Sequence, residues 1–578
     1  MRIALVAVVL LAAAGCMSSP EATPPDLPAP ALDDGLLDPM PSGAAASGHG
    51  ANITLAWEDT LGFGAEVPLV NGNLLSQYDS VTYDVPVDGS VATVQLRLAG
   101  DGVAVARLQD DEGNLLCVAR SGRVCSTRVN ETSKLTFPVQ VISLSPRGLT
   151  FQLEATLSPL APVFGVDPTP AALGFQVHRS EAQGGEPTLA VTADDRVLVV
   201  AGTAVLRLEA DGSFTDVTPP VEAALSQTLD PFLYGDAATG RVYLTQLSQC
   251  LRVWWTDDAG ASWTGNPEVC AGPEQHHQKV AVGPGPTENG VGPVPGARAI
   301  HISTMNLASW LTTDEVVVVH TRSLDGGLTW TQNPAKVKDV DSAELRNIGN
   351  IATQEVAGVV HAIAYRCDRF VDADYNGVSA GRSGDYGVTW TWQRIAPGGG
   401  RCEGIDPGVW ADGQLIYAAW EDMSAGGHVW WARSEDGGHV WGAPAMLDTP
   451  GLGSFVFTDI AAEAGAQAIA FLATPDTTLG PTQAPGWARW FPYVALNEQH
   501  GWTVYRLQDD PVQLGPICMD GPKCLDGARN LLDFIDVRID PQIGAVVAYP
   551  DGCEAECDWQ YESRDAFLRI AILPHPLS

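Results

Sequence analysis

The chain has 578 residues and a formal net charge of −37, from 69 acidic and 32 basic side chains. Apolar residues make up 45% of it and charged residues only 17%, which excludes a disordered polyelectrolyte. A field this negative repels nucleic acids and anionic membrane surfaces, so no nucleic-acid partner is expected. The 60 glycines and 41 prolines exclude a mainly helical fold and favour an all-β protein of short strands and turns.

The first sixteen residues have the pattern of an export signal. Arg2 precedes an apolar run over residues 3–15 that is too short to cross a bilayer as a stable helix. The sequence AAGC at 13–16 resembles a prokaryotic lipobox, in which cleavage leaves a lipidated cysteine; an ordinary secretory signal is the alternative. We expect a signal peptide at 1–16 and a protein anchored by Cys16 to the cell surface or to the outer face of a prokaryotic membrane.

Residues 17–50 differ in composition from everything that follows. They are rich in proline and contain no aromatic residue, lysine or arginine. Such a segment cannot bury a hydrophobic core, so we expect a disordered tether between the anchor and the folded part. The membrane would then be contacted through the lipid anchor only.

The other ten cysteines lie as near neighbours in the sequence. In an exported protein an even number of cysteines indicates disulfides, although their connectivity does not follow from the sequence. Pairing in sequence order is our hypothesis: Cys117–Cys125, Cys250–Cys270, Cys367–Cys402, Cys518–Cys524 and Cys553–Cys557. The alternative, a metal site, favours Cys-x-x-Cys pairs, and the sequence has none.

Residues 51–160 alternate apolar and polar positions in a way that is typical of strands. Turn signals such as Asp-Gly separate the strand-like runs, which lie at 80–86, 91–98, 103–108 and 149–157. The pattern predicts a small antiparallel β-sandwich in which Cys117 and Cys125 clip one hairpin. It is similar to the prepeptidase C-terminal sandwiches of secreted prokaryotic proteins, and that similarity implies a binding or spacing role.

From about residue 175 onward the chain repeats one short pattern, Ser-x-Asp-x-Gly-x-Thr-Trp. Its four copies are centred on Asp258, Asp325, Asp385 and Asp436, and an arginine precedes three of them. A short carboxylate accepts hydrogen bonds from the backbone of a tight turn, and glycine permits the positive φ of a reversal. We therefore interpret these aspartates as structural residues that hold turns between strands, each followed by a buried tryptophan.

This pattern resembles the Asp-box of the sialidase (BNR-repeat) superfamily. The chain after residue 172 looks similar to exported prokaryotic proteins of the exo-α-sialidase-like group. The resemblance implies a β-propeller in which the Asp-boxes lie on the face away from an active site. A shared fold does not by itself imply a shared reaction.

A second repeat marks where each unit begins, with a polar residue, often a proline, and then an apolar strand. Seven such starts occur, at Glu186, Asp230, His277, Asn347, Asp406, Asp459 and Asp533. Four short antiparallel strands per unit, arranged radially, make a propeller over 172–578; we expect seven blades, with six as the alternative. The last unit is expected to borrow a strand from residues 172–180 to close the ring.

The residues that open these strands define the first candidate site. In a propeller they line one mouth of the central channel, and a mostly acidic ring is expected there from Glu186, Asp230, His277, Asp406, Asp459 and Asp533. Such a ring would bind a cation or a polyol. The alternative is that Asp and Pro simply begin strands.

The sialidase resemblance also defines candidate catalytic residues. It implies three arginines that clamp the substrate carboxylate, a tyrosine nucleophile activated by a glutamate, and an aspartate acid/base. The chain lacks the family's Phe/Tyr-Arg-Ile-Pro motif, and the nearest sequence is HRS at 178–180. The remaining candidates are Arg346, Arg401, Arg529, Tyr549 and Tyr561.

A calcium loop is a further candidate. Asp372, Asp374 and Asn376 match the first half of an oxygen-ligand calcium loop, but Ser383 stands where a bidentate glutamate is needed. Calcium is therefore a candidate cofactor, and an acidic turn is the alternative. No other cofactor is required.

The sequence as a whole predicts a monomeric, lipid-anchored, sialidase-like propeller that binds extracellular glycans or protein ligands. The alternative hypothesis is an exo-α-sialidase or related glycoside hydrolase that acts on sialylated or other acidic glycans. A convergent arginine cluster beside a Tyr–Glu pair in one mouth of the channel would favour catalysis.

Overall fold

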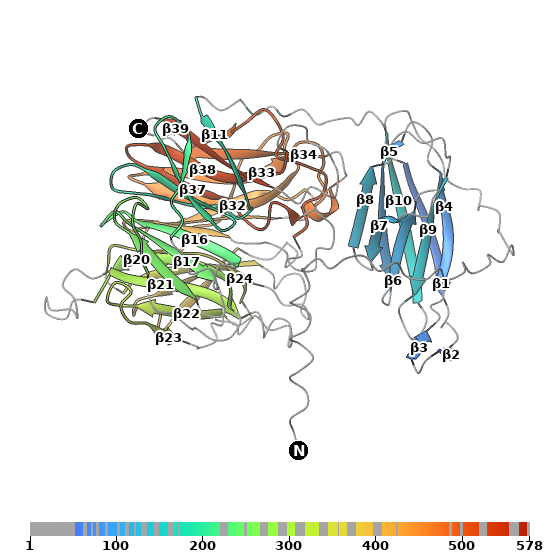
Figure 1. Cartoon of the computed structure of the whole chain (residues 1–578), viewed down its shortest axis with the longest axis horizontal. Coiled ribbons are helices and arrows are strands. Elements are labelled where there is room, and N and C mark those ends of the chain that lie inside the picture. The colour runs from blue at the N-terminus through green and yellow to red at the C-terminus, as the bar shows by residue number, and fades with distance from the viewer. Residues whose placement is uncertain are drawn as a thin grey trace, which may run out of the picture. The chain divides into compact units, whose positions relative to one another are not determined.

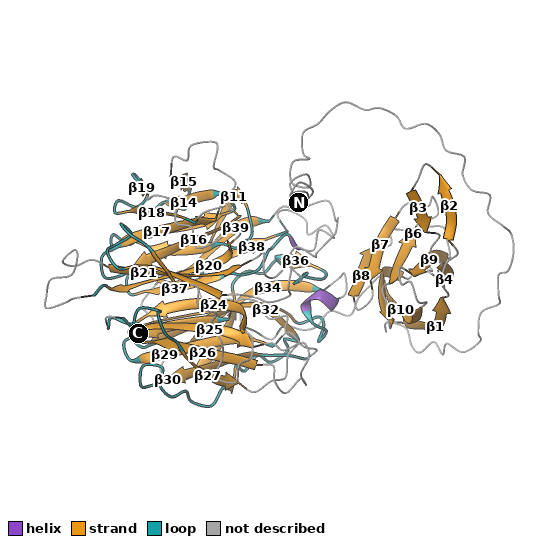
Figure 2. Ribbon diagram, turned by 90° about the horizontal axis from the view of Figure 1, so that it is seen from below, coloured by secondary structure: helices purple, strands orange, loops and turns teal. Residues whose placement is uncertain are grey.

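The protein is all-β in its computed structural model, and Figure 2 shows strands, in orange, through all of its folded regions. The described residues are 53–61, 66–70, 73–76, 80–86, 91–100, 104–109, 115–120, 123–128, 136–143, 149–159, 167, 169, 174–219, 229–247, 251–265, 275–286, 298–306, 318–333, 345–356, 358–366, 377–396, 407–422, 426–484, 488–497, 501–519, 529–553 and 566–574. The expected signal peptide, Cys16 and the tether lie outside these ranges. Within these ranges no helix has the length and apolar character to span a membrane.

The described strands before residue 160 form two four-stranded antiparallel sheets. One has the order β1-β10-β5-β8 and the other the order β4-β9-β6-β7, while β2 and β3 form a separate hairpin (Figure 1). Their bounds are β1 (Ile53–Leu61), β2 (Glu66–Val70), β3 (Asn73–Ser76), β4 (Ser80–Pro86), β5 (Val91–Gly100), β6 (Ala104–Gln109), β7 (Leu115–Arg120), β8 (Arg123–Arg128), β9 (Thr136–Ser143) and β10 (Leu149–Pro159).

Alternation of apolar and polar residues explains why these two sheets share one core. In β5, Val94, Leu96 and Leu98 are buried whereas Arg97 is exposed, because successive residues of a strand point to opposite faces. Buried residues of β5 and β10 from one sheet and of β6 and β9 from the other belong to a single hydrophobic cluster. The two sheets therefore enclose one core between their inner faces.

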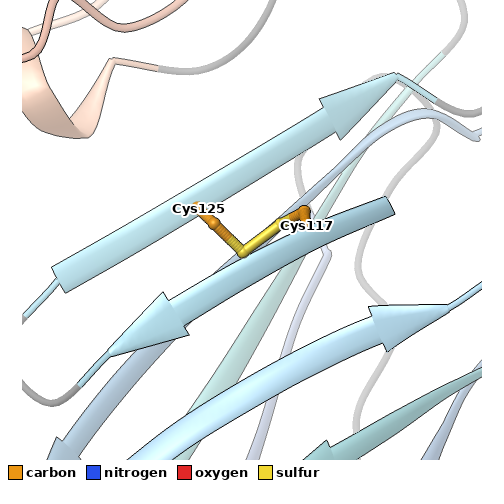
Figure 3. Close-up of a disulfide and its surroundings, with 2 residues drawn as sticks. All are labelled: Cys117 and Cys125. Carbon is orange, nitrogen blue, oxygen red and sulfur yellow. A yellow bond between two sulfur atoms is a disulfide. The ribbon is translucent and has the colours of Figure 1, made fainter. Parts of the chain in front are cut away.

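A disulfide joins Cys117 of β7 to Cys125 of β8 (Figure 3). These are the two cysteines expected to pair, but the expectation that they clip a hairpin is wrong. β7 pairs with β6 and β8 pairs with β5, so the two strands belong to different sheets. The chain crosses from one sheet to the other between Arg120 and Arg123, and the disulfide consequently links the two sheets within their shared core.

Seven further antiparallel sheets are formed by the described residues between 176 and 574. Six of them consist of four strands that follow one another in the sequence, and in the last of these six β36 adds a fifth strand beside β34. The seventh sheet has the order β11-β39-β38-β37.

The bounds of these strands are as follows. The first three sheets contain β12 (Thr188–Val191), β13 (Val197–Ala201), β14 (Ala204–Leu208), β15 (Phe214–Asp216), β16 (Leu229–Asp236), β17 (Arg241–Leu247), β18 (Arg252–Thr256), β19 (Thr264–Gly265), β20 (Gln275–Pro284), β21 (Arg298–Asn306), β22 (Val318–Ser323) and β23 (Thr331–Asn333). The next three contain β24 (Leu345–Thr353), β25 (Val360–Arg366), β26 (Gly377–Ser383), β27 (Thr391–Ala396), β28 (Gly408–Asp412), β29 (Leu415–Glu421), β30 (Val429–Ser434), β31 (Ala445–Met446), β32 (Ser454–Glu463), β33 (Ala466–Thr474), the 3-10 helix η4 (Pro481–Gln483), β34 (Arg489–Asn497), β35 (Trp502–Arg506) and β36 (Gln513–Leu514). The seventh contains β11 (Gln176–Gln183), β37 (Asp536–Asp540), β38 (Gly544–Asp551) and β39 (Phe567–Pro574).

The first strands of these sheets contact one another in a closed cycle. β12 contacts β16, and the contacts continue through β20, β24, β28 and β32 to β37, which contacts β12 again. Apolar side chains fill the space between neighbouring sheets; one cluster joins Tyr243 and Val253 of the second sheet to Val280 and Ile300 of the third. The sheets therefore surround a common axis, which is the arrangement of a β-propeller.

The last sheet takes its outer strand from the beginning of this region. β11 pairs with β39, and Figure 1 shows the two strands together. The buried guanidinium of Arg569 in β39 donates to the carboxylate of Asp551 in β38 and to the backbone carbonyl of Ser180 in β11. β11 overlaps residues 172–180, so the pairing confirms the expected strand exchange.

Each Asp-box forms the turn between the third and fourth strands of a sheet. In the turn after β26, the carboxylate of Asp385 accepts hydrogen bonds from the hydroxyl of Ser383 and from the backbone N–H and hydroxyl of Thr389. Equivalent turns follow β18, β22 and β30 and are held by Asp258, Asp325 and Asp436. These carboxylates are therefore occupied within their own turns.

Arginines connect three of these turns to the preceding sheet. Arg207 of β14, Arg322 of β22 and Arg382 of β26 each donate to a backbone carbonyl in the turn of the next sheet. The acceptors are the fourth residues of the respective turns, Ala259, Tyr386 and Gly437. Two of the arginines that precede an Asp-box in the sequence thus act between sheets.

Candidate functional site

The first strands are irregular near their beginnings. β16, β20, β24 and β32 each shift register against the second strand of their sheet, as at Leu229/Phe232 and at His276/Lys279. Bulges of this kind change the direction of side chains and are frequent beside functional sites. We call the beginnings of the seven first strands, β12, β16, β20, β24, β28, β32 and β37, the strand-start mouth. The sequence predicts a ring of polar residues in this region.

Three side chains of that predicted ring are described. Glu186 and Asp533 are buried and lie shortly before β12 and β37, and Glu186 has a positive φ of 54°. Asp459 lies inside β32, which begins at Ser454, and it directly follows the bulge, as Lys279 does in β20. Asp406 and the side chains of Asp230 and His277 lie outside the described residues.

Arg529 and Asp533 form a two-armed ion pair at this mouth. Both terminal nitrogens of Arg529 donate to the two carboxylate oxygens of Asp533. A guanidinium binds a carboxylate most strongly through such a fork, and here the fork holds a carboxylate of the protein itself. Arg529, the described member of the predicted arginine clamp, is therefore already paired.

A buried lysine from β20 faces two aromatic rings at the same mouth. The ammonium of Lys279 lies 3.9 Å from the ring centre of Phe534 and 5.3 Å from that of Phe232. The two ring centres are 6.5 Å apart. These residues come from the second, third and seventh sheets, so the fold gathers them from distant parts of the sequence. Contacts of this kind stabilise a cation in a buried site.

Gln278, the neighbour of Lys279, has an unsatisfied side chain. It is 2% exposed, and both its amide oxygen and its amide nitrogen lack a hydrogen-bond partner among the described residues. Leaving such a buried group without a partner costs about 1–3 kcal/mol. Sequence reasoning missed Gln278, although this carboxamide directly follows His277 of the expected ring, which was the available signal.

A second polar cluster lies in the first strands of three sheets. Asp459 of β32, Asp536 and Arg538 of β37, and Asn350 of β24 contact one another there. Burial raises the pKa of both carboxyl groups, and the raised pKa of Asp536 also reflects the nearby charge of Asp459. Sequence reasoning missed this cluster because its members are far apart in the chain.

The predicted sialidase chemistry is not assembled by the described residues. Tyr549 is fully buried, its hydroxyl donates to the amide oxygen of Gln508 at 2.8 Å, and burial raises its pKa. Its partner is thus an amide and not the activating glutamate. Arg401, Tyr561 and the side chain of Arg346 lie outside the described residues.

The remaining predicted sites fall largely outside the described ranges. These include the calcium candidates Asp372, Asp374 and Asn376, and the cysteines Cys250, Cys270, Cys367, Cys402, Cys524 and Cys557. Cys518 and Cys553 are each disulfide-bonded, to partners outside the described ranges. The described residues contain no group of three His, Cys, Asp or Glu side chains suited to a metal ion.

Comparison with known proteins identifies no family. No family model and no curated protein matches the sequence. Among solved structures, the Aleuria aurantia lectin, a six-bladed β-propeller with fucose recognition, is 13% identical over 60% of this chain and 100% of its own, with a TM-score of 0.35. An α-L-arabinofuranosidase of Fusarium graminearum is 11% identical over 62% of this chain and 95% of its own, with a TM-score of 0.37. AofleA from Arthrobotrys oligospora is 13% identical over 58% and 90%, with a TM-score of 0.35.

Proposed function

We propose that this chain is an exported binding protein whose strand-start mouth holds an extracellular glycan. In this proposal the seven sheets after residue 176 are the blades of a seven-bladed propeller, and the two sheets of residues 51–160 form a sandwich similar to prepeptidase C-terminal domains. A lipidated Cys16 anchors the protein, which acts as a monomer. Calcium binding at Asp372, Asp374 and Asn376 is part of the same proposal.

The observation that carries the proposal is the unpaired amide of Gln278. A buried carboxamide offers one acceptor and two donor hydrogens, and a stable protein normally satisfies them. A glycan hydroxyl both donates and accepts, so it matches this side chain. The energetic cost of leaving Gln278 unpaired in the free protein is then recovered when a ligand binds.

The ion pairing at the mouth supports binding more than hydrolysis of acidic glycans. Both terminal nitrogens of Arg529 are paired with Asp533, so its guanidinium is not available for a substrate carboxylate. The carboxyl groups of Asp459 and Asp536 both contact the guanidinium of Arg538, so they too are paired within the protein.

A substitution at Gln278 tests the proposal. Gln278→Leu keeps the size of the side chain and removes both unpaired atoms. We expect it to raise the free energy of unfolding by about 1–3 kcal/mol while weakening glycan binding at least tenfold, which corresponds to about 1.4 kcal/mol. The measurements are denaturant unfolding, and calorimetry with a glycan selected by array screening of the full chain.

The matched control is Gln354→Leu. Gln354 is equally buried, but its amide nitrogen donates to the carbonyl of Gly413 at 2.7 Å, after the far end of β24. This variant should lose stability and keep its glycan affinity. Unchanged glycan affinity in Gln278→Leu, or the absence of any glycan ligand, would refute the proposal. So would hydrolysis of fluorogenic sialosides by the native chain that disappears in Arg529→Ala.

A further inference from the structure

Three ionisable side chains are buried together between β32 and β37, the first strands of the sixth and seventh sheets. Asp459 lies in β32, and Asp536 and Arg538 lie in β37; each is less than 10% exposed. One terminal nitrogen of Arg538 lies 2.5 Å from Asp536 Oδ1 and 3.6 Å from Asp459 Oδ2. Two carboxyl groups thus share a single guanidinium in a site with little access to water.

Each carboxyl group also holds the backbone of the next first strand. Asp459 Oδ2 accepts from the N–H of Val537 in β37 at 3.2 Å, and Asp536 Oδ2 accepts from the N–H of Leu189 in β12 at 2.7 Å. At the next junction the hydroxyl of Thr188 accepts from the N–H of Leu233 in β16 at 2.8 Å. The same contact therefore joins three successive pairs of strands, twice through a carboxyl group and once through a neutral hydroxyl.

Asp459 and Asp536 both contact the guanidinium of Arg538, so two ionised carboxyl groups would leave an uncompensated negative charge in this buried site. Burial and the charge of Asp459 raise the pKa of Asp536 well above its usual value, so Asp536 is the carboxyl group that takes up a proton. The amide nitrogen of Asn350 in β24 donates to Asp459 Oδ1 at 2.6 Å, which stabilises the ionised form of Asp459. With one proton present, the cluster of two carboxyl groups and one guanidinium is electrically neutral, which reduces the cost of burial.

Other elements packed around the cluster contribute few charges. Trp410 of β28 covers the guanidinium of Arg538 at 4.8 Å. Tyr234 of β16 is partly buried and interacts electrostatically with Arg538; burial raises its pKa, so its hydroxyl stays neutral. Lys279 of β20 directs its ammonium at the ring of Phe534, two residues before Asp536.

We propose that a single proton bound by the buried pair of Asp459 and Asp536 is a structural component of ring closure, and that its loss in alkaline solution loosens β37 from β32 and β12. Without that proton two buried carboxylates face one guanidinium, and their repulsion acts on the strand that completes the cycle. β37 follows directly on Asp533 and Phe534, so the strand-start mouth is connected to the same event.

The sign of the effect follows from the raised pKa of Asp536. The folded chain keeps this proton over a pH range in which the unfolded chain has released it. Stability from this group is therefore complete at acidic pH and is lost as the pH rises above the ordinary aspartate value toward the raised one.

Asp536→Asn tests the proposal because the side chain keeps its size and no longer titrates. One of its two polar atoms becomes a donor, so the variant loses the contact with either Leu189 or Arg538 and is less stable than the native chain. We expect the full native chain to have the higher melting temperature near pH 5 and this advantage to shrink near pH 9, because only the native chain loses the proton. The matched control is Asp476→Asn, which removes a buried carboxylate that is paired with Arg489 and should lower the melting temperature equally at both pH values.

Infrared spectroscopy gives an independent readout of the proton itself. At neutral pH the native chain should show the C=O stretch of a protonated carboxylic acid, and this band should be absent in Asp536→Asn and in Asp459→Asn. If Asp536→Asn does not fold, Asp459→Asn serves in its place, because it leaves Asp536 paired one-to-one with Arg538. Parallel melting curves of the native chain and the variant, or no protonated carboxyl band at neutral pH, would overturn the proposal.

Discussion

The four Asp-box turns differ in one hydrogen bond that the aspartate carboxylate accepts. In three turns the Oδ2 atom accepts from a hydroxyl four residues later, at 2.6–2.7 Å, as Asp385 does from Thr389. Asp436 lacks this bond because Val440 stands at the equivalent position. Val440 is also 63% exposed, so a polar side chain fits there without repacking.

Restoring the hydroxyl should therefore stabilise the protein. We expect Val440→Thr to raise the free energy of unfolding by about 0.5–1.5 kcal/mol, the usual contribution of one hydrogen bond. The reciprocal variant, Thr389→Val, should lower it by a similar amount. Denaturant titration of both variants provides the measurement, and a Val440→Thr protein no more stable than the native chain would contradict the expectation.

At the residue scale, local contacts were predictable from the sequence and distant ones were not. An Asp-box can be recognised because its donors lie within four residues of the aspartate. Asp459 binds the backbone of Val537, 78 residues away, and that contact depends on which first strands are neighbours in the ring. Sequence reasoning consequently read Asp459 as a strand start, whereas the bulge after Val456 places it inside β32.

Between elements, the arginines that precede Asp-boxes have unequal roles. Arg382 donates to the carbonyl of Gly437 in the turn of the next sheet at 2.9 Å. Arg433 occupies the same position before its own Asp-box, but the sequence of the following sheet contains no Asp-box, and the Arg433 guanidinium pairs with the exposed Glu435. Arg382 and Arg433 can therefore be compared directly: Arg382 connects two sheets, whereas Arg433 forms an ion pair on the surface.

We expect Arg382→Ala to lower the free energy of unfolding by about 1.5–3 kcal/mol, because it removes a charged hydrogen bond between sheets. Arg433→Ala should change it by less than about 1 kcal/mol, as for other exposed ion pairs. Urea denaturation of the two variants compares them directly. Equal losses in both would show that the contact with Gly437 contributes nothing specific.

The pairing of strands was harder to predict than the strands themselves. Period-two alternation identified the strand at 91–98 and placed Cys117 and Cys125 close together. It could not show that the chain changes sheets between Arg120 and Arg123, because alternation describes the faces of a strand and not its neighbours. A hairpin and a crossover between stacked sheets have the same local sequence signature.

For the whole molecule, buried histidines between sheets set the response to acid. His301 and His320 are hydrogen-bonded to each other under the turn that contains Tyr386, and burial lowers the pKa of both, that of His320 to about 3. Burial likewise lowers the pKa of His361 to about 3. Below the usual histidine pKa these three histidines bind protons in the unfolded chain but stay neutral in the folded chain. Folding stability therefore falls as the pH is lowered from about 6.5 toward 3.

His361→Phe should make the protein less sensitive to acid. Phenylalanine keeps an aromatic ring in the same space and cannot titrate. Relative to the native chain, we expect the variant to retain about 1.4 kcal/mol more stability for each pH unit below 6.5. Urea unfolding at several pH values between 4 and 7 measures the slope, and identical slopes for the two proteins would contradict the assignment.

The pairing of β11 with β39 has a consequence for biosynthesis. A ribosome makes β11 before any other strand of the ring and makes its partner, Phe567–Pro574, after all of them. The nascent chain must therefore carry an unpaired strand while all the other sheets of the ring are made, and a chain that terminates early leaves that strand exposed to other molecules.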